Sequence, residues 1–513
     1  MKPTRIGTAA SAALLLALTA ACSAGSGSSG SGGAGGTGGT GGSGGGDTSL
    51  TVGLVAEPAS LDFTTKDGAA IPQALLDNVY ETLVTVDQDG KIKPSLAKSW
   101  TVSDDGKTYT FDLVDNAKFT DGQAFTAKDA VYSINRVKKD WTISLKAAMD
   151  VVSDAKAVSD TKLQVTLSKP SNDWLYRMST RVGAMMTEKA VADLATKPVG
   201  TGPFVFDQWR RGDSITLKAN PTYWGTKPYF QNVTLKYFKD PTALNNALLT
   251  KTIDVIGTVQ APESLAQFQG NDAYEIVEGT TNGEVLLSFN NGKAPFNDLK
   301  VRQAARYAID HKALLDTCWA GRGTLAGSMV PPTDPWYEDL TGLYPHDLDK
   351  AKSLLAQTSA AATPVRLRIP SLPYAVSCGQ VVKSQLEQAG FKVTLDQLEF
   401  PAVWLSTVFT DADYDMSIVA HVEPRDLPAV FGDPKYYTRY DNKQLQADLK
   451  AADSGTPEEQ VTLMKKAARE LSEDAAGDVL FILPNLMVAE KGITGLPKNA
   501  ITESFDLAGL ARS

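Results

Sequence analysis

Cysteine and histidine are scarce in this sequence. Among 513 residues there are 3 Cys and 3 His. The cysteines are Cys22, Cys318 and Cys378, which form no CxxC pair and are too few for a four-cysteine zinc site. The histidines show neither HxxxH nor HExxH spacing. We therefore expect no metal site built by the protein and no resident cofactor.

No strongly basic tract is present either. The chain has 50 Lys and Arg residues against 59 Asp and Glu residues, a net charge of −9. Nucleic-acid binding requires clustered positive charge, so we expect no nucleic-acid partner. A GxSxG nucleophile elbow is also missing, and no carboxylate pair stands out. We expect a protein that is not an enzyme, with a secreted hydrolase as the alternative.

The one marked apolar run lies near the start of the chain. Lys2 and Arg5 precede the small and apolar residues 8–21, a pattern typical of a signal peptide. A transmembrane helix needs roughly 20 apolar residues, which this run does not reach. We therefore predict a signal peptide over residues 1–21.

Cys22 directly follows this run. Small residues before a cysteine at this point resemble the bacterial lipobox, in which the cysteine is acylated, although Leu18 stands four positions before Cys22 where three is usual. Residues 23–46 contain only Gly, Ser, Ala and Thr, a composition typical of a flexible tether. We expect residues 22–46 to form a lipidated tether that holds the protein on the outer side of the cell membrane.

Local patterns in the rest of the chain predict strands, turns and helices. Residues 49–55 alternate as a strand does, and residues 70–85 carry apolar side chains at helical spacing. Asp105-Gly106 predicts a hairpin turn. Thr126 with Asp129 three positions later resembles a capping box that begins a helix.

Several ordered motifs then resemble one family, the family 5 solute-binding proteins of peptide, nickel and oligosaccharide ABC importers, the oligopeptide- and dipeptide-binding type. The first motif runs from Pro94 through Trp100, Tyr109 and Phe119 to Tyr132. The others are "VGTGPFVFDQW" at 199–209, "ANPTYWG" at 219–225, "APFNDLKVRQAARYAIDHKALL" at 294–315 and "YPHDLDKAKSLLAQ" at 344–357.

The resemblance implies an α/β fold, the two-lobed clamp of periplasmic binding proteins with an inserted subdomain in the first lobe. Its expected divisions are lobe I at 47–75, 198–285 and 486–513, the inserted subdomain at 76–197, and lobe II at 286–485. The expected hinge strands are residues 283–290 and 477–488. The lobes of such a clamp close around a ligand by hinge rotation.

The resemblance also implies a function and partners. We expect a monomer that binds a small peptide or similar solute and delivers it to ABC permease and ATPase subunits. The alternatives are a nickel chelate, an oligosaccharide, or another amine or acid solute.

Ligand-binding residues are expected where loops face the cleft between the lobes. Glu57 matches a family loop that lines the cleft, with a role as a turn cap as the alternative. Thr281 and Asn282 precede a hinge strand and offer uncharged hydrogen-bonding groups.

Residues 413–431 are the richest candidate stretch of lobe II. In peptide-binding relatives the matching loop carries an aspartate that pairs with the peptide amine, whereas this chain has Pro424 there. Glu423 or Asp426 can take that role, and Arg425 can face a carboxylate. The alternative is a surface turn whose charges compensate one another. His421 matches a position often held by Trp.

Aromatic residues complete the candidates. Tyr374, Trp404 and Tyr436 are each a candidate for a cleft wall, with ordinary core packing as the alternative. An oxidising compartment permits a disulfide between Cys318 and Cys378. Two buried thiols are equally compatible with the sequence, so both states stay open.

Overall fold

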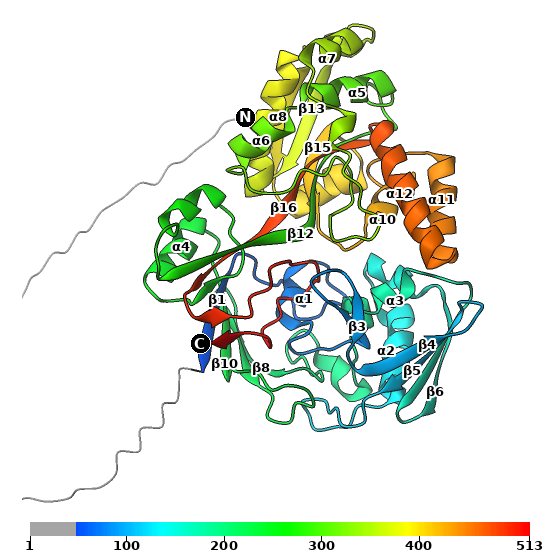
Figure 1. Ribbon diagram of the computed structural model, residues 1–513, viewed down its shortest axis with the longest axis vertical. Helices are drawn as coiled ribbons and strands as arrows, with labels where there is room; N and C mark the ends of the chain where they lie inside the picture. Colours follow the sequence, from blue (N-terminus) through cyan, green and yellow to red (C-terminus); the bar gives the residue numbers. More distant parts are fainter. Residues whose placement is uncertain (1–47) are drawn as a thin grey trace, which may run out of the picture. The chain divides into compact units, whose positions relative to one another are not determined.

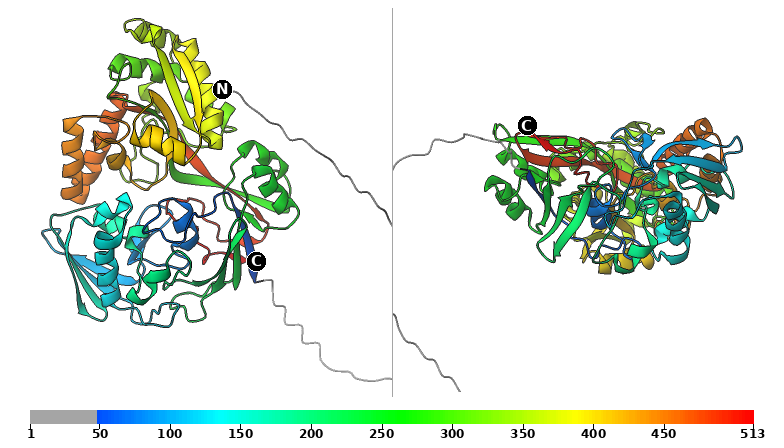
Figure 2. Two further views of the ribbon diagram at one scale, coloured as in Figure 1. Left: turned by 180° about the vertical axis from the view of Figure 1, so that it is seen from behind. Right: turned by 90° about the horizontal axis from the view of Figure 1, so that it is seen from below.

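The computed structural model describes residues 48–513 as an α/β structure (Figures 1 and 2). The predicted signal peptide, the lipidation of Cys22 and the tether lie outside the described residues. None of the helices in residues 48–513 is both long enough and apolar enough to cross a membrane.

A ten-stranded sheet, with the order β14-β13-β15-β12-β16-β11-β1-β10-β9-β8, runs through both lobes. The half around β1 is called the first lobe below. The strand expected near residue 49 is present as β1, which pairs in parallel with β10 and β11. The bounds here are β1 Ser49–Leu54, β8 Phe204–Arg210, β9 Ser214–Ala219, β10 Asn232–Tyr237 and β11 Val255–Ile256, with helices α1 Ala70–Leu75 and α4 Pro241–Leu249.

The half around β13 is called the second lobe. Its helices surround β13 in Figure 1, and Val365, Leu367 and Ile369 of β13 are buried in its core. The strands are β13 Pro364–Pro370, β14 Lys392–Leu398 and β15 Met416–His421. The helices are α5 Leu299–Ala308, α6 His311–Cys318, α7 Leu348–Leu355, α8 Pro373–Gln388, α9 Ala402–Trp404, α10 Leu427–Phe431, α11 Lys443–Ser454 and α12 Pro457–Glu473.

Two long antiparallel strands connect the lobes: β12 (Tyr274–Phe289) and β16 (Gly477–Glu490). They cover the strand expected at 477–488 and, except for residue 290, the strand expected at 283–290. Their pairing is regular from Tyr274 to Thr280 and shifts register between Thr280 and Glu284. In Figures 1 and 2 they cross from one lobe to the other, so the irregular part of the ladder lies within the connection between the lobes.

A four-stranded sheet in the order β4-β5-β7-β6 forms the core of residues 97–167. The predicted hairpin and capping box are both confirmed. Gly106, with φ of 68°, makes the turn between β4 and β5, and the side chains of Thr126 and Asp129 form the capping box of α2. The bounds are β2 Val84–Val86, β3 Ile92–Pro94, β4 Ala97–Val102, β5 Thr108–Leu113, α2 Ala127–Asp140, β6 Val152–Ser159, β7 Lys162–Leu167 and α3 Trp174–Arg177.

The prediction of a helix over residues 70–85 is wrong beyond Leu75. Helix α1 ends at Leu75, and Asp77 has a positive φ of 59°. The side chain of Asn78 then donates to the Phe505 carbonyl at 2.8 Å and accepts from the Leu507 amide at 3.0 Å. These tertiary hydrogen bonds to a distant part of the chain override the helical spacing.

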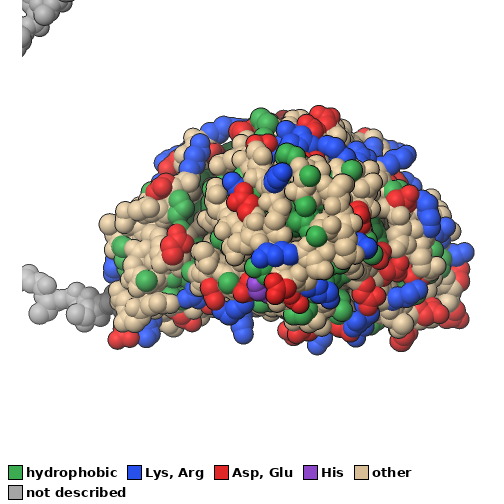
Figure 3. Space-filling view, turned by 90° about the horizontal axis from the view of Figure 1, so that it is seen from above, with side chains coloured by type: hydrophobic (Ala, Val, Ile, Leu, Met, Phe, Trp, Pro, Cys, Tyr) green, Lys and Arg blue, Asp and Glu red, His purple; other side chains and the backbone are tan. Residues whose placement is uncertain are grey.

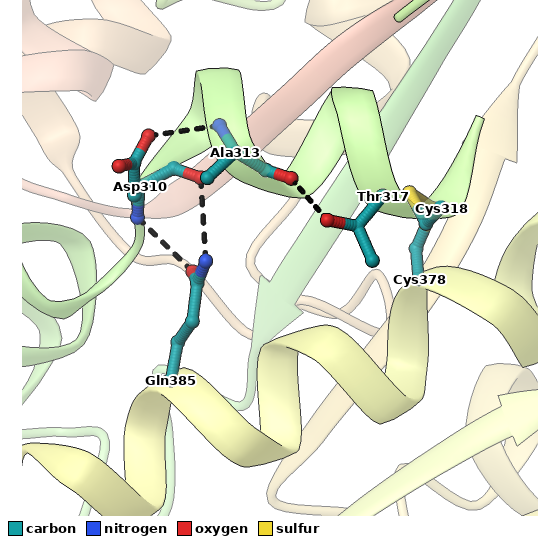
Figure 4. Close-up of a disulfide and its surroundings, with 6 residues drawn as sticks. All are labelled: Asp310, Ala313, Thr317, Cys318, Cys378 and Gln385. Carbon is teal, nitrogen blue, oxygen red and sulfur yellow. Dashed lines mark hydrogen bonds between the residues drawn. A yellow bond between two sulfur atoms is a disulfide. The ribbon is translucent and has the colours of Figure 1, made fainter. Parts of the chain in front are cut away.

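A disulfide joins Cys318 of α6 to Cys378 of α8 (Figure 4). The Cα atoms are 4.9 Å apart, within the range that the bond requires. At the other end of the same helix pair, the Asp310 amide donates to the side-chain oxygen of Gln385 at 3.0 Å. The two helices are therefore joined at both ends. The sequence left open whether Cys318 and Cys378 form a disulfide or stay two thiols, and the structure has the disulfide.

The face of the second lobe seen from above in Figure 3 mixes Lys and Arg side chains with Asp and Glu side chains. Hydrophobic side chains are scattered among them, as is normal for a protein surface. Positive and negative charges therefore alternate over short distances on this face.

Candidate ligand-binding site

A cavity of about 720 Å³ lies between the two lobes. Cavities of about 300–1,000 Å³ are typical of small-molecule sites. The second lobe contributes Trp319, Tyr374, Val422 and Glu423, and the first lobe contributes residues of α1 and the turns after it. Residues of β12 and β16 also line the cavity, as does much of segment 497–508. Both lobes and both connecting strands thus contribute residues to the cavity wall.

Thr281 and Asn282 lie in the cavity wall, where the β12–β16 ladder is irregular. The Thr281 hydroxyl donates to the Leu483 carbonyl at 2.7 Å, and the Asn282 amide donates to the Ile501 carbonyl at 2.8 Å. These two predicted residues therefore hold the connection between the lobes together at the cavity surface.

Arg181 is the single basic residue among the described residues that line the cavity. Its guanidinium contacts Glu503 at 2.6 Å and Asp67 at 3.3 Å, and its side chain is 2% exposed. The Arg181 amide also donates to the second oxygen of Glu503, at 2.6 Å. Arg181 and Glu503 form a buried ion pair, which is sensitive to the loss of either member.

Two further carboxylates of the cavity wall are buried. Glu81 accepts hydrogen bonds from the Tyr223 hydroxyl and the Trp224 indole, both at 2.8 Å. Burial raises the pKa of Glu81 to about 7, against the opposing effect of these hydrogen bonds. Burial likewise raises the pKa of Asp77 to about 6, although the Ser504 hydroxyl donates to it at 2.6 Å. Both groups lack a cationic partner among these contacts.

The raised pKa of Glu81 predicts a pH-dependent stability. A carboxyl group with a raised folded-state pKa stabilises the fold below its unfolded-state pKa, and that contribution is lost as pH rises through the folded-state value. Between pH 4 and pH 8 we expect the free energy of unfolding of the wild type to fall by about 3 kcal/mol relative to Glu81→Gln. Urea unfolding at both pH values measures this difference.

The exposed Glu263 provides the control for that comparison. Glu263→Gln should follow the wild type at both pH values. A Glu81→Gln variant whose stability also follows the wild type would show that folding does not raise the pKa of Glu81.

The loop after β15 places Glu423 and Arg425 in different surroundings. Glu423 lines the cavity, and burial raises its pKa. Arg425 does not line it; its guanidinium stacks on the Tyr176 ring at 3.7 Å and lies 3.8 Å from Asp334. Arg425 therefore does not present its charge to the cavity, and the sequence hypothesis that it faces a ligand carboxylate is not supported by its contacts.

Asp426 is buried behind Glu423, outside the cavity lining. In the part of the chain that the structure describes, neither carboxylate oxygen of Asp426 has a hydrogen-bond partner, and one oxygen of the buried Glu284 also has none. Burial raises both pKa values well above the usual range; the charge of Asp426 raises the pKa of Glu284 further, and the charge of Glu423 raises that of Asp426. Asp426 and Glu284 thus add two buried carboxyl groups close to Glu423.

His421 and Tyr436 lie beside this region without lining the cavity. His421 shares a 2.9 Å hydrogen bond with the Tyr437 hydroxyl. Burial lowers the pKa of His421 to about 4, so it is neutral at pH 7 and does not offset the acidic charge. Tyr436 packs edge-on against Phe409, with ring centroids 5.1 Å apart.

Glu57 and Trp404 also lie outside the lining. The Glu57 carboxylate accepts hydrogen bonds from the Trp209 indole at 2.9 Å and the Gly212 amide at 2.8 Å, so it binds a turn distant in sequence and does not cap the next element. The Trp404 indole is buried and donates to the Ser417 hydroxyl at 3.2 Å. Of the predicted residues, the structure brings Thr281, Asn282, Tyr374 and Glu423 together in the cavity wall.

Sequence reasoning missed Arg181 and Glu503. They are 322 positions apart, and neither stands in a distinctive local pattern. Asp77 and Glu81 were also missed, because the helical spacing of residues 70–85 suggested a packing role. Only a tertiary structure brings these four residues together.

The lobes also touch each other on the side away from the β12–β16 connection, next to α3 and α11 in Figure 1. Asn172 donates through its side chain to the Ala452 and Gly455 carbonyls, both at 2.9 Å. Asp453 accepts from the Ser171 hydroxyl at 2.6 Å and pairs with Lys169 at 3.1 Å. We call this set, Lys169, Ser171 and Asn172 with Ala452, Asp453 and Gly455, the far-side contact.

Two lobes on crossing strands, with a cavity between them, define a two-lobed solute-binding protein. The chain belongs to the bacterial extracellular solute-binding proteins, family 5, whose middle-region model matches residues 91–443.

Named relatives support this assignment. The nickel-binding periplasmic protein of Escherichia coli strain K12 is 31% identical over 348 residues, which are 62% of this chain and 65% of that protein. Heme-binding protein A of Haemophilus influenzae is 31% identical over 307 residues, which are 54% of this chain and 56% of that protein. The matched part is thus less than two thirds of each of these relatives. The probable D,D-dipeptide-binding periplasmic protein DdpA of E. coli K12 is 27% identical over 88% of this chain and 92% of its own length.

Solved structures share the fold. AgaA of A. tumefaciens R10, in complex with agropinic acid, is 25% identical with a TM-score of 0.79, over 91% of this chain and 99% of that one. DppA of Helicobacter pylori, in complex with the peptide STSA, is 22% identical with a TM-score of 0.81, over 90% and 98%. The expected two-lobed α/β fold is therefore confirmed.

Proposed function

We propose that this protein is an extracytoplasmic receptor that binds a peptide-like solute between its lobes and delivers it to an ABC permease with its ATPase. The observation that carries the proposal is the 720 Å³ cavity, which both lobes and both crossing strands line. A change in the angle between the lobes alters this cavity directly, which is how hinge closure couples to binding. The family assignment and the dipeptide-binding relative support the proposal.

The proposal includes the setting of the receptor. Residues 1–21 act as the signal peptide, Cys22 carries the lipid, and the monomeric body divides at 285/286 and 485/486 into its lobes. The role is binding without catalysis. In its support, the described cavity wall contains neither histidine nor cysteine, and its acidic groups are held by neighbouring protein groups or backed by further carboxyls.

Ligand binding should raise the melting temperature of the protein. A solute that binds the native state alone stabilises it by about 2.7 kcal/mol at a hundred times its Kd. A thermal-shift screen of di- to pentapeptides, sugars and nickel chelates measures the effect. A shift with sugars or chelates but with no peptide would contradict the peptide-like solute.

Two valine variants make this screen specific for the cavity. Val422 lines the cavity and is 44% exposed, whereas Val102 is 43% exposed on β4, outside the lining. Val422→Trp should place a bulky ring in the cavity and abolish the ligand-induced shift, while Val102→Trp should preserve it. Equal shifts in both variants would place binding elsewhere.

A further inference from the structure

We infer that the cavity selects a solute that carries a positive charge and no free carboxylate. This inference rests on the proposed function and adds the charge of the ligand. It is carried by the set of charged side chains on the cavity wall and by their contacts with one another.

The charged residues of the wall are almost all acidic. The acidic members are Asp77, Glu81, Asp87, Glu423, Glu503 and Asp506, and the single basic member is Arg181. Asp87 pairs with Lys93 at 3.1 Å, and Glu503 pairs with Arg181 at 2.6 Å. Within residues 48–513 the remaining acidic groups of the wall have no such ion pair, so the wall has acidic groups but no free basic group.

Arg181 is not available to a ligand carboxylate. Besides Glu503 and Asp67, its guanidinium donates to the Gly68 carbonyl at 3.3 Å, and its side chain is 2% exposed. A ligand carboxylate would have to displace Glu503, which would leave a buried carboxylate without its partner, a strongly unfavourable change. A solute with a free carboxylate therefore meets no free cation in the described wall.

Glu423 and Asp77 are the best placed acids to receive a cation. Within residues 48–513 Glu423 has no ion pair within 4 Å, and its charge acts on the buried Asp426 and Glu284, which have oxygens without hydrogen-bond partners there. Asp77 is held by one hydroxyl, that of Ser504. A ligand ammonium beside either group supplies the missing countercharge, and such charge-assisted hydrogen bonds are roughly twice as strong as neutral ones.

The basic residues near Glu423 already have partners. Arg177 pairs with Asp173 at 2.7 Å and donates to the Pro424 carbonyl at 3.2 Å. Arg425 faces Tyr176 and Asp334. The negative charge of Glu423 is therefore compensated only at a distance.

Aromatic rings on the second-lobe side of the wall also suit a cation. Trp319 and Tyr374 are both buried, line the cavity, and meet edge to face with centroids 6.5 Å apart. Aromatic faces attract ammonium and guanidinium groups and pack against the apolar part of a ligand. The solute thus combines an ammonium or guanidinium group with an apolar or planar portion.

Isothermal titration of the full protein with matched probes tests the inference. The probes are the dipeptide Lys-Phe with an amidated C-terminus, its free acid, and the free acid acetylated on both amines. We expect the amide to bind at least tenfold tighter than the free acid, and the acetylated acid not to bind. Equal affinities, or tighter binding of the free acid, would overturn the inference while leaving the receptor function intact.

Other outcomes separate the two proposals. Binding of a neutral sugar with none of the dipeptide probes would also overturn the inference and keep the receptor function. If no peptide, amine, sugar or chelate binds, the receptor function fails and the inference fails with it.

Two glutamate variants test whether Glu423 binds the positive charge of the ligand. Glu423→Gln should weaken the amide at least tenfold, whereas Glu387→Gln on the exposed surface of α8 should not change its affinity. Melting curves of both variants in the absence of ligand report whether they fold like the wild type. A folded Glu423→Gln variant with unchanged affinity would remove Glu423 from cation binding.

Discussion

We expect the free energy of unfolding of the double variant Cys318→Ser/Cys378→Ser to be about 4 kcal/mol lower than that of the oxidised wild type. The disulfide closes a loop with a sequence separation of 60. In the chain-entropy description a loop of this size contributes about 4 kcal/mol by restricting the unfolded chain, between about 3 for 15 residues and about 4.7 for 100. The bridge joins α6 to α8 within the buried core of the second lobe, so its loss acts on that lobe first.

Urea unfolding at constant pH measures this loss, with a reductant as the control. The wild type in reductant should match the double variant, and the variant should not respond to the reductant. A wild-type midpoint that is unchanged on full reduction, checked by thiol counting, would show that the bridge does not stabilise the fold.

The second large effect concerns the far-side contact. The double variant Asn172→Ala/Asp453→Ala removes side-chain hydrogen bonds to the Ala452 and Gly455 carbonyls and from the Ser171 hydroxyl. Net contributions of about 0.5–1.5 kcal/mol for each bond suggest a loss of roughly 3 kcal/mol from the state in which the lobes touch. We expect ligand affinity to fall about a hundredfold, because a less populated binding-competent state lowers the apparent affinity in proportion.

A nearby serine supplies the matched control. The Ser454 hydroxyl donates within its own helix to the Lys450 carbonyl at 3.0 Å, so Ser454→Ala should leave affinity unchanged. Fluorescence transfer between labels on the two lobes should report a larger average separation in the double variant alone. Wild-type affinity in the double variant would mean that the far-side contact does not contribute to closure.

Local sequence patterns predicted those parts of the fold that depend on neighbouring residues. The turn at Gly106 and the capping box of Thr126 and Asp129 are set by residues close in sequence, and both are present. The apolar strands at 283–290 and 477–488 were recognisable because buried strands read as continuous hydrophobic runs. The helix beyond Leu75 was mispredicted, because Asn78 hydrogen-bonds to residues 505 and 507 instead.

The residues that line the cavity were also predictable only in part, because some of them are brought together by contacts between segments distant in sequence. Thr281, Asn282, Tyr374 and Glu423 were found because they stand in loops or strand ends that the family resemblance places at the cleft. Arg181 and Glu503 come from segments 322 positions apart, and their pairing depends on how segment 497–508 returns to the first lobe. No local pattern encodes such an encounter, although it decides which charges the cavity presents.

The register shift in the β12–β16 ladder has a further consequence. It falls between Thr280 and Glu284, and Thr281, Asn282 and Gly283 are also cavity wall. A molecule seated there touches the same backbone that must flex when the lobes move. Occupancy should therefore slow deuterium uptake at the amides of residues 281–283, so that mass spectrometry can detect binding in the unlabelled protein.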